Sequence, residues 1–274
     1  MNTTENLTLI WDSPSLLVSS LLLDNPLFWG LAIAGVLLTG ISKSGFAGGA
    51  GVIAVPLLSL VIPVPMAAAL MLPLLIVMDA KSMQYYWQTV CWQELITIVP
   101  AALIGIVAGA YLLGELPSNL LQLLLGIFCI AFASWKRLTP LLGRLPHAGL
   151  IWSVISGLTS TLLHSGGPPI NIYLATRRLP KRNWLATAAV FFAVMNIVKV
   201  IPYSLTGQWD SFALDPTLSA PSLLLIDIIL LPFSLIGVWL GYRLHTKISE
   251  ENFMLACKSL LFLSGAGLLS SAMI

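Results

Sequence analysis

Hydrophobic residues run through this chain in about ten segments separated by short polar stretches. They lie at roughly 28–44, 50–62, 66–87, 93–113 and 118–136 in the first half, and at 149–164, 168–176, 183–206, 221–241 and 253–273 in the second. A helix of about 20 residues crosses a bilayer. The last three segments of each half are long enough to span, whereas the first two are short. The pattern predicts an all-α polytopic membrane protein with roughly 8–10 hydrophobic segments.

In each half, a stretch of small and polar residues joins the two short segments. The first runs from Gly40 to Gly51 and reads GISKSGFAGGAG, and the second runs from Gly157 to Asn171 and reads GLTSTLLHSGGPPIN. Helix breaks at corresponding places in two halves point to the binding site of a transporter. We therefore expect an unwound stretch at each place, followed by a new short helix. The sequence leaves open whether these short pairs are re-entrant hairpins or full spans.

The charged residues between segments predict how the chain is oriented. Loops 136–147, 177–182 and 242–252 hold most of the 13 Lys and Arg residues, which places them in the cytoplasm by the positive-inside rule. The N-terminal tail and the loops 114–118 and 207–220 carry only acids. We expect them outside, with both termini. The two halves then have opposite orientations.

The two halves also match in residues. Gly40 aligns with Gly157, and Val77–Asp79 aligns with Val194–Asn196, both at an offset of 117. A Pro-x4-Gly-x3-Gly pattern at Pro100 recurs at Pro232. These matches predict two inverted repeats, each a broken helical hairpin plus three transmembrane helices. The predicted units are an external tail at 1–27, a first repeat at 28–136, a cytoplasmic linker at 137–148 and a second repeat at 149–274.

Composition narrows the classes of function. The chain of 274 residues is 58% hydrophobic and 9% charged, whereas soluble domains carry roughly 25% charged residues. A lipid bilayer is therefore the expected environment, and a net charge of +2 gives no reason to expect a nucleic-acid partner. No metal-ligand cluster or ATP-binding motif is apparent in the sequence, so no metal and no cofactor are expected.

The breaks supply the candidate substrate-binding residues, because the N-terminus of a half-helix offers free N–H groups to an anion. The candidates are Ser42, Lys43, Ser44, Gly45, Gly48, Gly49, Gly51, Thr159, Ser160, His164, Gly166, Gly167, Pro168 and Asn171. A lysine deep in a span costs about 3 kcal/mol or more, which favours a functional role for Lys43. The alternative is that Lys43 reaches the outer surface. The alternative for His164 is a core imidazole bonded to a carbonyl.

A second polar group lies in the third segment of each half. Asp79 and Asn196 occupy matching positions, and Lys199 follows Asn196 by one helical turn. Intramembrane ionisable residues of this kind often carry protons or pair with one another. We take these three residues as candidates for ion coupling. Alternatively, Asp79 and Lys81 only mark the cytoplasmic end of segment 66–87.

The sequence around the breaks resembles that of a known family. The stretch SKSGFAGGAG at Ser42–Gly51, with Pro56 and two leucines after it, and GGPP at Gly166–Pro169 are similar to the two signature stretches of the sulfite exporter TauE/SafE family. The resemblance covers nearly the whole chain. It implies a permease of two repeats in the bacterial cytoplasmic (inner) membrane that moves sulfite, a sulfonate or a related sulfur compound. It assigns no role to His164.

Together these features predict a secondary transporter for a small anion that works by alternating access, and not an enzyme. A homodimer is a possible assembly. Two alternatives remain open at the level of sequence. One is an anion channel, and the other is an intramembrane enzyme that uses His164 beside Ser160 and Ser165.

Overall fold

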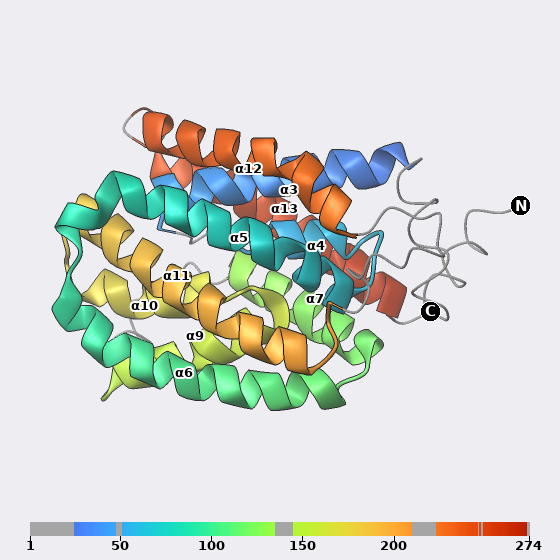
Figure 1. Ribbon diagram of the computed structural model, residues 1–274, viewed down its shortest axis with the longest axis horizontal. Coiled ribbons are helices and arrows are strands. Elements are labelled where there is room, and N and C mark those ends of the chain that lie inside the picture. The colour runs from blue at the N-terminus through green and yellow to red at the C-terminus, as the bar shows by residue number, and fades with distance from the viewer. Residues whose placement is uncertain are drawn as a thin grey trace, which may run out of the picture.

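The protein is all-helical throughout the residues that the computed structural model describes, which are 25–47, 51–134, 145–209, 223–245, 247 and 249–272 (Figure 1). The helices are α3 (Pro26–Gly45), α4 (Ala54–Leu58), α5 (Val64–Tyr86), η1 (Trp87–Thr89), α6 (Trp92–Glu115), α7 (Ser118–Ser134), α9 (Ala148–Leu163), α10 (Gly167–Thr176), α11 (Lys181–Leu205), α12 (Leu223–Leu244) and α13 (Glu250–Ala272). Most of the predicted tail, linker and outer loop lies outside the described residues, as do Gly48 and Gly49.

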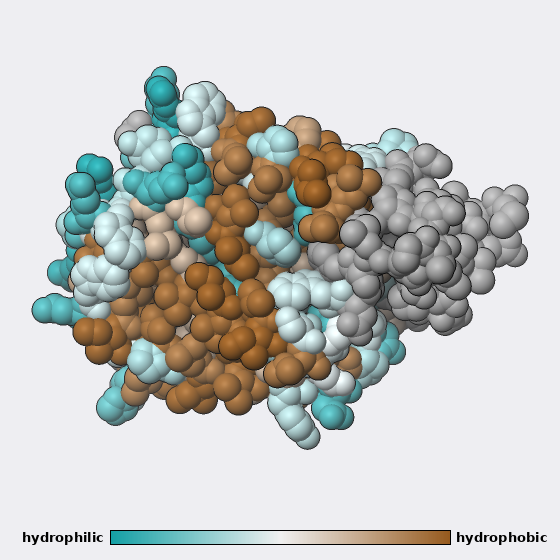
Figure 2. Space-filling model, in the orientation of Figure 1, coloured by the Kyte–Doolittle hydropathy of each residue, from teal (hydrophilic) through white to brown (hydrophobic). Residues whose placement is uncertain are grey.

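The predicted all-α membrane class is confirmed. Six of the described helices are long and apolar enough to cross a membrane, namely α3, α5, α6, α11, α12 and α13. The helices α7 and α9 are apolar but shorter, with 17 and 16 residues. Large apolar side chains such as Ile96 and Val107 are more than 70% exposed, and Figure 2 shows apolar residues across the middle of the visible face. Such a surface suits lipid rather than water.

The described chain ends lie on one side of the molecule. The start of α3, the end of α13 and the turn between α6 and α7 gather at the right of Figure 1. The turn between α10 and α11 and the end of α12 lie at the opposite end. The helices α5 and α11 run in opposite directions (Figure 1). This arrangement groups the predicted outer segments at one end. Which end faces the cytoplasm stays a prediction.

The two halves pack against each other at two helix crossings, and glycines at matching positions form both of them. In one crossing, α6 packs on α9. A Cβ added to Gly157 would lie 2.1 Å from the backbone oxygen of Ala102, and one added to Gly105 would lie 2.0 Å from that of Val154. Only a residue without a side chain allows backbones to approach this closely.

In the second crossing the roles of the two halves are reversed, and the corresponding glycines make the contacts. Here α12 packs on α3. A Cβ on Gly40 would lie 2.9 Å from the backbone oxygen of Ser234, and one on Gly237 would lie 2.7 Å from that of Leu37. Gly40 corresponds to Gly157, and Gly237 corresponds to Gly105. The helices α6 and α12 therefore each brace the broken first helix of the other half.

The helix breaks are shorter than predicted. The helix α3 continues to Gly45 and α9 continues to Leu163, so most of the polar residues of both stretches are helical. Hydroxyl groups that bond back one turn explain this: Ser44 Oγ donates to Gly40 O at 3.2 Å, and Thr161 Oγ1 donates to Gly157 O at 2.9 Å.

The chain leaves both helices at matched residues. Ala47 and His164 lie 117 positions apart and both have left-handed backbone, with φ of 52° and 50°. The short helix after the first break is only Ala54–Leu58, shorter than the predicted segment 50–62. In the second half, α10 begins as expected, with Pro168 and Pro169 in its first turn.

The glycine crossing generates a stability prediction. Gly→Ala in an exposed helix normally stabilises by roughly 0.5–1 kcal/mol. We expect Gly157→Ala to do the opposite and lower the midpoint of thermal unfolding in detergent, because the added methyl group meets backbone rather than a movable side chain. The matched control is Gly30→Ala in α3, where nothing lies within 4 Å of the added carbon. Equal unfolding midpoints for the two variants would contradict the close crossing.

Candidate functional site

A buried ion pair joins α3, the helix before the first break, to α5. Lys43, in the last turn of α3, pairs through its Nζ atom with Asp79 Oδ1, about two turns before the end of α5. The other carboxylate oxygen of Asp79 accepts a hydrogen bond from Asn196 Nδ2 of α11 at 2.5 Å. Lys43 and Asp79 are 7% and 1% exposed. Lys43 therefore does not reach the outer surface, and Asp79 does not merely mark a helix end.

A second lysine is buried beside this pair without a carboxylate partner. Lys199 Nζ lies 3.0 Å from both Ser160 O and Ser160 Oγ, and 2.8 Å from His164 Nδ1. Three acceptors match the three donors of an ammonium group. Within the described residues the ion pairs are Lys43–Asp79 and Arg177–Glu94. The partners of Lys199 Nζ in this part of the chain are thus a carbonyl, a hydroxyl and an imidazole.

The contacts of His164 assign its tautomer. Its Nδ1 accepts from the Lys199 ammonium, so Nε2 carries the proton and donates to Ala68 O at 2.9 Å. The hydroxyl of Tyr203, 3.3 Å from Nε2, donates to Thr161 O at 2.8 Å. The imidazole is therefore a neutral core group bonded to a carbonyl. It also faces the cavity described next.

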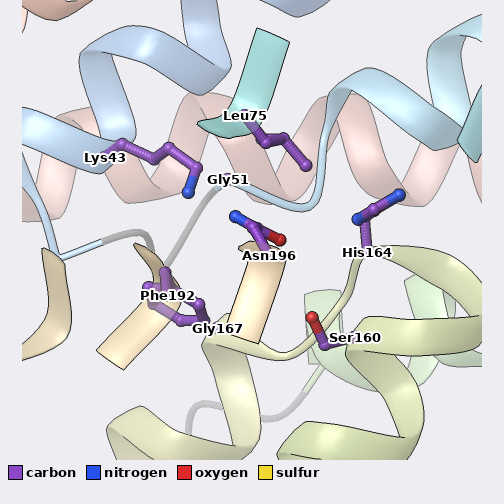
Figure 3. Close-up of a pocket in the computed structure, with 8 residues that line it drawn as sticks. All are labelled: Lys43, Gly51, Leu75, Ser160, His164, Gly167, Phe192 and Asn196. Carbon is purple, nitrogen blue, oxygen red and sulfur yellow. The ribbon is translucent and has the colours of Figure 1, made fainter. Parts of the chain in front are cut away.

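These groups surround a small cavity between the two breaks (Figure 3). The cavity measures about 20 Å³, which is room for about one water molecule. It is lined by Lys43, Gly51, Leu75, Ser160, His164, Gly167, Phe192 and Asn196. Figure 3 shows that the side chains converge from α3, α5, α9, α11 and the loop after α9. An oxyanion such as sulfite is larger than one water, so it fits only after the surrounding helices move apart.

Matched positions of the two halves supply much of this lining. Lys43 corresponds to Ser160 and Leu75 to Phe192, at the same offset of 117. Asp79 and Asn196, which also correspond, touch each other directly. The cavity therefore lies where equivalent parts of the two halves meet.

A pair of tyrosines repeats the same relation next to the cavity. Tyr86 Oη donates to Ser44 O at 2.7 Å, and Tyr203 Oη donates to Thr161 O at 2.8 Å. Both the donors and the acceptors are 117 residues apart. The ends of α3 and α9 are thus fixed by the same interaction in both halves.

Three of the predicted binding residues serve helix packing instead of lining this cavity. Ser44 Oγ donates to Val238 O of α12 at 2.7 Å. A Cβ on Gly45 would lie 2.9 Å from Gly241 O, and one on Gly166 would lie 2.8 Å from Ser156 O. Ser42 is fully buried in α3. Ser44 ties α3 to α12, and Gly45 and Gly166 allow backbones to approach closely.

Three other predicted residues face a second, larger cavity. Thr159, Pro168 and Asn171 line a space of about 530 Å³ among α7, α9, α10 and α13, with a mainly apolar wall. Asn171 Nδ2 donates to Ala47 O at 3.2 Å, and Asn171 Oδ1 accepts from Trp184 Nε1 at 2.9 Å. The mainly apolar wall of this larger cavity suits an anion less well than the wall of the small cavity, near which the charged groups gather.

Some site residues escaped the sequence analysis. Leu75, Phe192 and Tyr203 belong to the cavity and its surroundings. A systematic comparison at the offset of 117 would have paired Leu75 with Phe192 and Tyr86 with Tyr203. Within the described part of the chain, no three His, Cys, Asp or Glu residues gather to hold a metal ion.

One further polar cluster ties α10 to α6. Glu94, which is 6% exposed, accepts from Tyr173 Oη at 2.6 Å and from Arg177 Nε at 2.7 Å. The hydrogen bond to Glu94 raises the pKa of the Arg177 guanidinium. No sequence signal distinguished this cluster from ordinary loop charges.

The fold and the cavity define a class: a polytopic helical membrane protein with a buried, charged cavity between two broken helices. The chain matches the model of the family described as Sulfite exporter TauE/SafE over residues 31–268 and belongs to that family. The match covers nearly the whole chain and identifies the protein as a membrane transporter. Neither the curated proteins nor the solved structures gave a match.

The buried ion pair generates the second prediction. Removing one partner of a buried pair leaves an uncompensated charge and destabilises by about 3–5 kcal/mol. We expect Lys43→Met to lower the unfolding midpoint strongly, and the double variant Lys43→Met with Asp79→Asn to recover much of the loss. Lys81→Met is the control, because Lys81 makes an exposed hydrogen bond to Gln84 and lies over the ring of Tyr85, with no carboxylate partner among the described residues. A double variant no more stable than Lys43→Met would contradict a direct pairing.

Proposed function

We propose that the protein is a secondary transporter for a small sulfur-containing anion such as sulfite or a sulfonate. The observation that carries this proposal is a buried lysine, Lys199, that bonds two residues lining the cavity. Lys43 is paired with Asp79, whereas Lys199 has no carboxylate within 4 Å among the described residues. A bound anion would provide the missing negative charge. Sulfur oxyanions present several acceptor oxygens to ammonium, hydroxyl and amide donors.

The matched contacts support two inverted repeats as the basis of transport. The glycine crossings, the left-handed turns at Ala47 and His164 and the two tyrosine bonds all recur at equivalent positions. In transporters of this construction, one repeat or bundle moves against the other around a fixed central site. The cavity at the meeting of the two halves is the natural centre of such a motion. Its small size corresponds to a closed arrangement that must open to admit the substrate.

The contacts of His164 give little support to the enzyme hypothesis. The ring nitrogens bond Lys199 and Ala68, and Ser165 Oγ donates to Leu163 O at 3.1 Å. Within the described residues, no serine hydroxyl bonds to this imidazole. A nucleophilic serine needs a base within hydrogen-bonding distance.

Transport in reconstituted liposomes tests the proposal. We expect saturable flux of labelled sulfite or a sulfonate, and a loss of about tenfold or more in Lys43→Ala, since an anion contact of about 1.4 kcal/mol is removed. Lys81→Ala, which changes a lysine at the end of α5, is the control and should keep wild-type flux.

Three outcomes would argue against this assignment. The absence of flux of any sulfur oxyanion would contradict the proposed function. Equal flux in Lys43→Ala and wild type would contradict the site. Flux that rises linearly with concentration would favour the channel alternative.

We propose in addition that the protein lies in the bacterial cytoplasmic membrane with both termini outside. The inside-negative potential then favours export of an anion by about 2.3 kcal/mol per charge per 100 mV. Gln84 is exposed in the last turn of α5, and Asn119 is exposed in the first turn of α7. The end of α5 and the turn before α7 lie at opposite ends of the molecule (Figure 1). Uptake would need coupling to another ion.

Sidedness can be measured with introduced cysteines. In a variant without native cysteines, we expect Asn119→Cys to react with an impermeant maleimide in intact cells. Gln84→Cys should react only after the membrane is opened. The reverse pattern would invert the proposed orientation, which rests on the positive-inside rule.

A further inference from the structure

We propose that the central site selects monovalent anions, and that Asp79 is the residue that sets this selectivity. The inference rests on the proposed transport function and deepens it by naming the charge class of the substrate. Hydrogen sulfite and sulfonates fall inside this class, whereas sulfate and fully ionised sulfite fall outside it.

The first step is a count of the charged groups at the cavity. Lys43 lines the cavity, and Asp79 and Lys199 bond residues that line it. We take both lysines as ammonium groups and Asp79 as a carboxylate, which gives two positive charges and one negative charge. His164 is neutral because its Nδ1 accepts from Lys199. Tyr86 and Tyr203 keep their protons, since each hydroxyl donates to a backbone carbonyl. The described groups around the cavity therefore sum to one positive charge.

The second step is the surroundings of that charge. Lys199 and Asp79 are 0% and 1% exposed, and the cavity holds about one water. Water cannot neutralise a net charge in such a place, and an unpaired buried charge is strongly unfavourable. A monovalent anion makes the occluded complex neutral. A divalent anion leaves it with one negative charge.

The third step is the position of Asp79 opposite its equivalent, Asn196. The two side chains have nearly the same shape and bond to each other across the meeting of the halves. An Asp–Asn exchange at either position therefore changes the charge with little change in volume. Asp79→Asn raises the net charge of the site to two positive charges, and Asn196→Asp lowers it to zero.

The experiment compares two ligands that keep their charges over a wide pH range. Methanesulfonate and sulfate both carry sulfur-bound oxygens, with one and two negative charges. The full-length protein is reconstituted in liposomes without a membrane potential, and the half-saturating concentration and maximal flux of each ligand are measured. We expect wild type to favour methanesulfonate by about tenfold or more.

The variants then test Asp79 itself. Asp79→Asn should move the ratio of the two ligands toward sulfate by about tenfold or more. Asp79→Glu, which preserves the charge, should keep the wild-type ratio. Asn196→Asp should weaken both ligands. A residue with only a structural role would change flux without changing the ratio.

The outcomes separate this inference from the transport proposal. Transport of methanesulfonate and sulfate with equal preference would overturn the charge selectivity and leave the transporter intact. An unchanged ratio in folded Asp79→Asn would overturn the role of Asp79. No flux of any sulfur oxyanion would overturn the proposed function itself. Should a variant not fold, saturable ligand-induced shifts of the wild-type unfolding midpoint at constant ionic strength decide the selectivity, because binding to a site saturates whereas the general stabilising effect of sulfate does not.

Discussion

Two helices are interrupted inside this membrane protein, and the rest of the structure has to satisfy the backbone that the interruptions expose. In hydrocarbon, such groups must be bonded within the protein. The second half does part of this for the first, because Asn171 of α10 donates to Ala47 O at the first break. Ser156 Oγ covers Gly166 O at 2.7 Å from within the second half. Because the first break depends partly on the second half, the two breaks lie close together, and the cavity forms between them.

The lysines at this cavity illustrate a conflict between stability and function. A lysine paired with a carboxylate, as Lys43 is with Asp79, is already an expensive way to fill a membrane core. Burial of Lys199 is more costly still, because its three hydrogen bonds are made but no carboxylate among the described residues pairs with it. Packing gives no reason for such a group, and an apolar residue there would suit the fold better. Departures of this kind from the rules of stability concentrate at functional sites. On the proposed function, Lys199 supplies positive charge for anion binding.

Much of this arrangement could be predicted from the sequence, and the failures have identifiable causes. Hydropathy located the segments, and the offset of 117 matched Asp79 with Asn196, which touch in the structure. The lengths of the breaks were wrong, because glycine and serine suggest unwinding, whereas Ser44 bonds back along its own helix. The direction in which each side chain points could also not be predicted from the sequence pattern. Ser44 and Ser160 lie in corresponding stretches, yet the first contacts α12 and the second lines the cavity. Such differences depend on the phase of each helix relative to its neighbours.

The packing residues are equivalent in the two halves, whereas the charged residues are not, and this difference has consequences for transport. Equivalent glycines, turns and tyrosines give the halves the same mechanical construction, so on the proposed mechanism each can adopt the arrangement of the other. The charged groups follow no such equivalence, since Lys43 corresponds to Ser160 and Asp79 to Asn196. Lys43 and Asp79 come from the first half, and Lys199 comes from the second. An anion held between them therefore contacts both halves whichever way the cavity opens. A single site of this kind can keep its charge balance throughout a cycle in which only the access path changes.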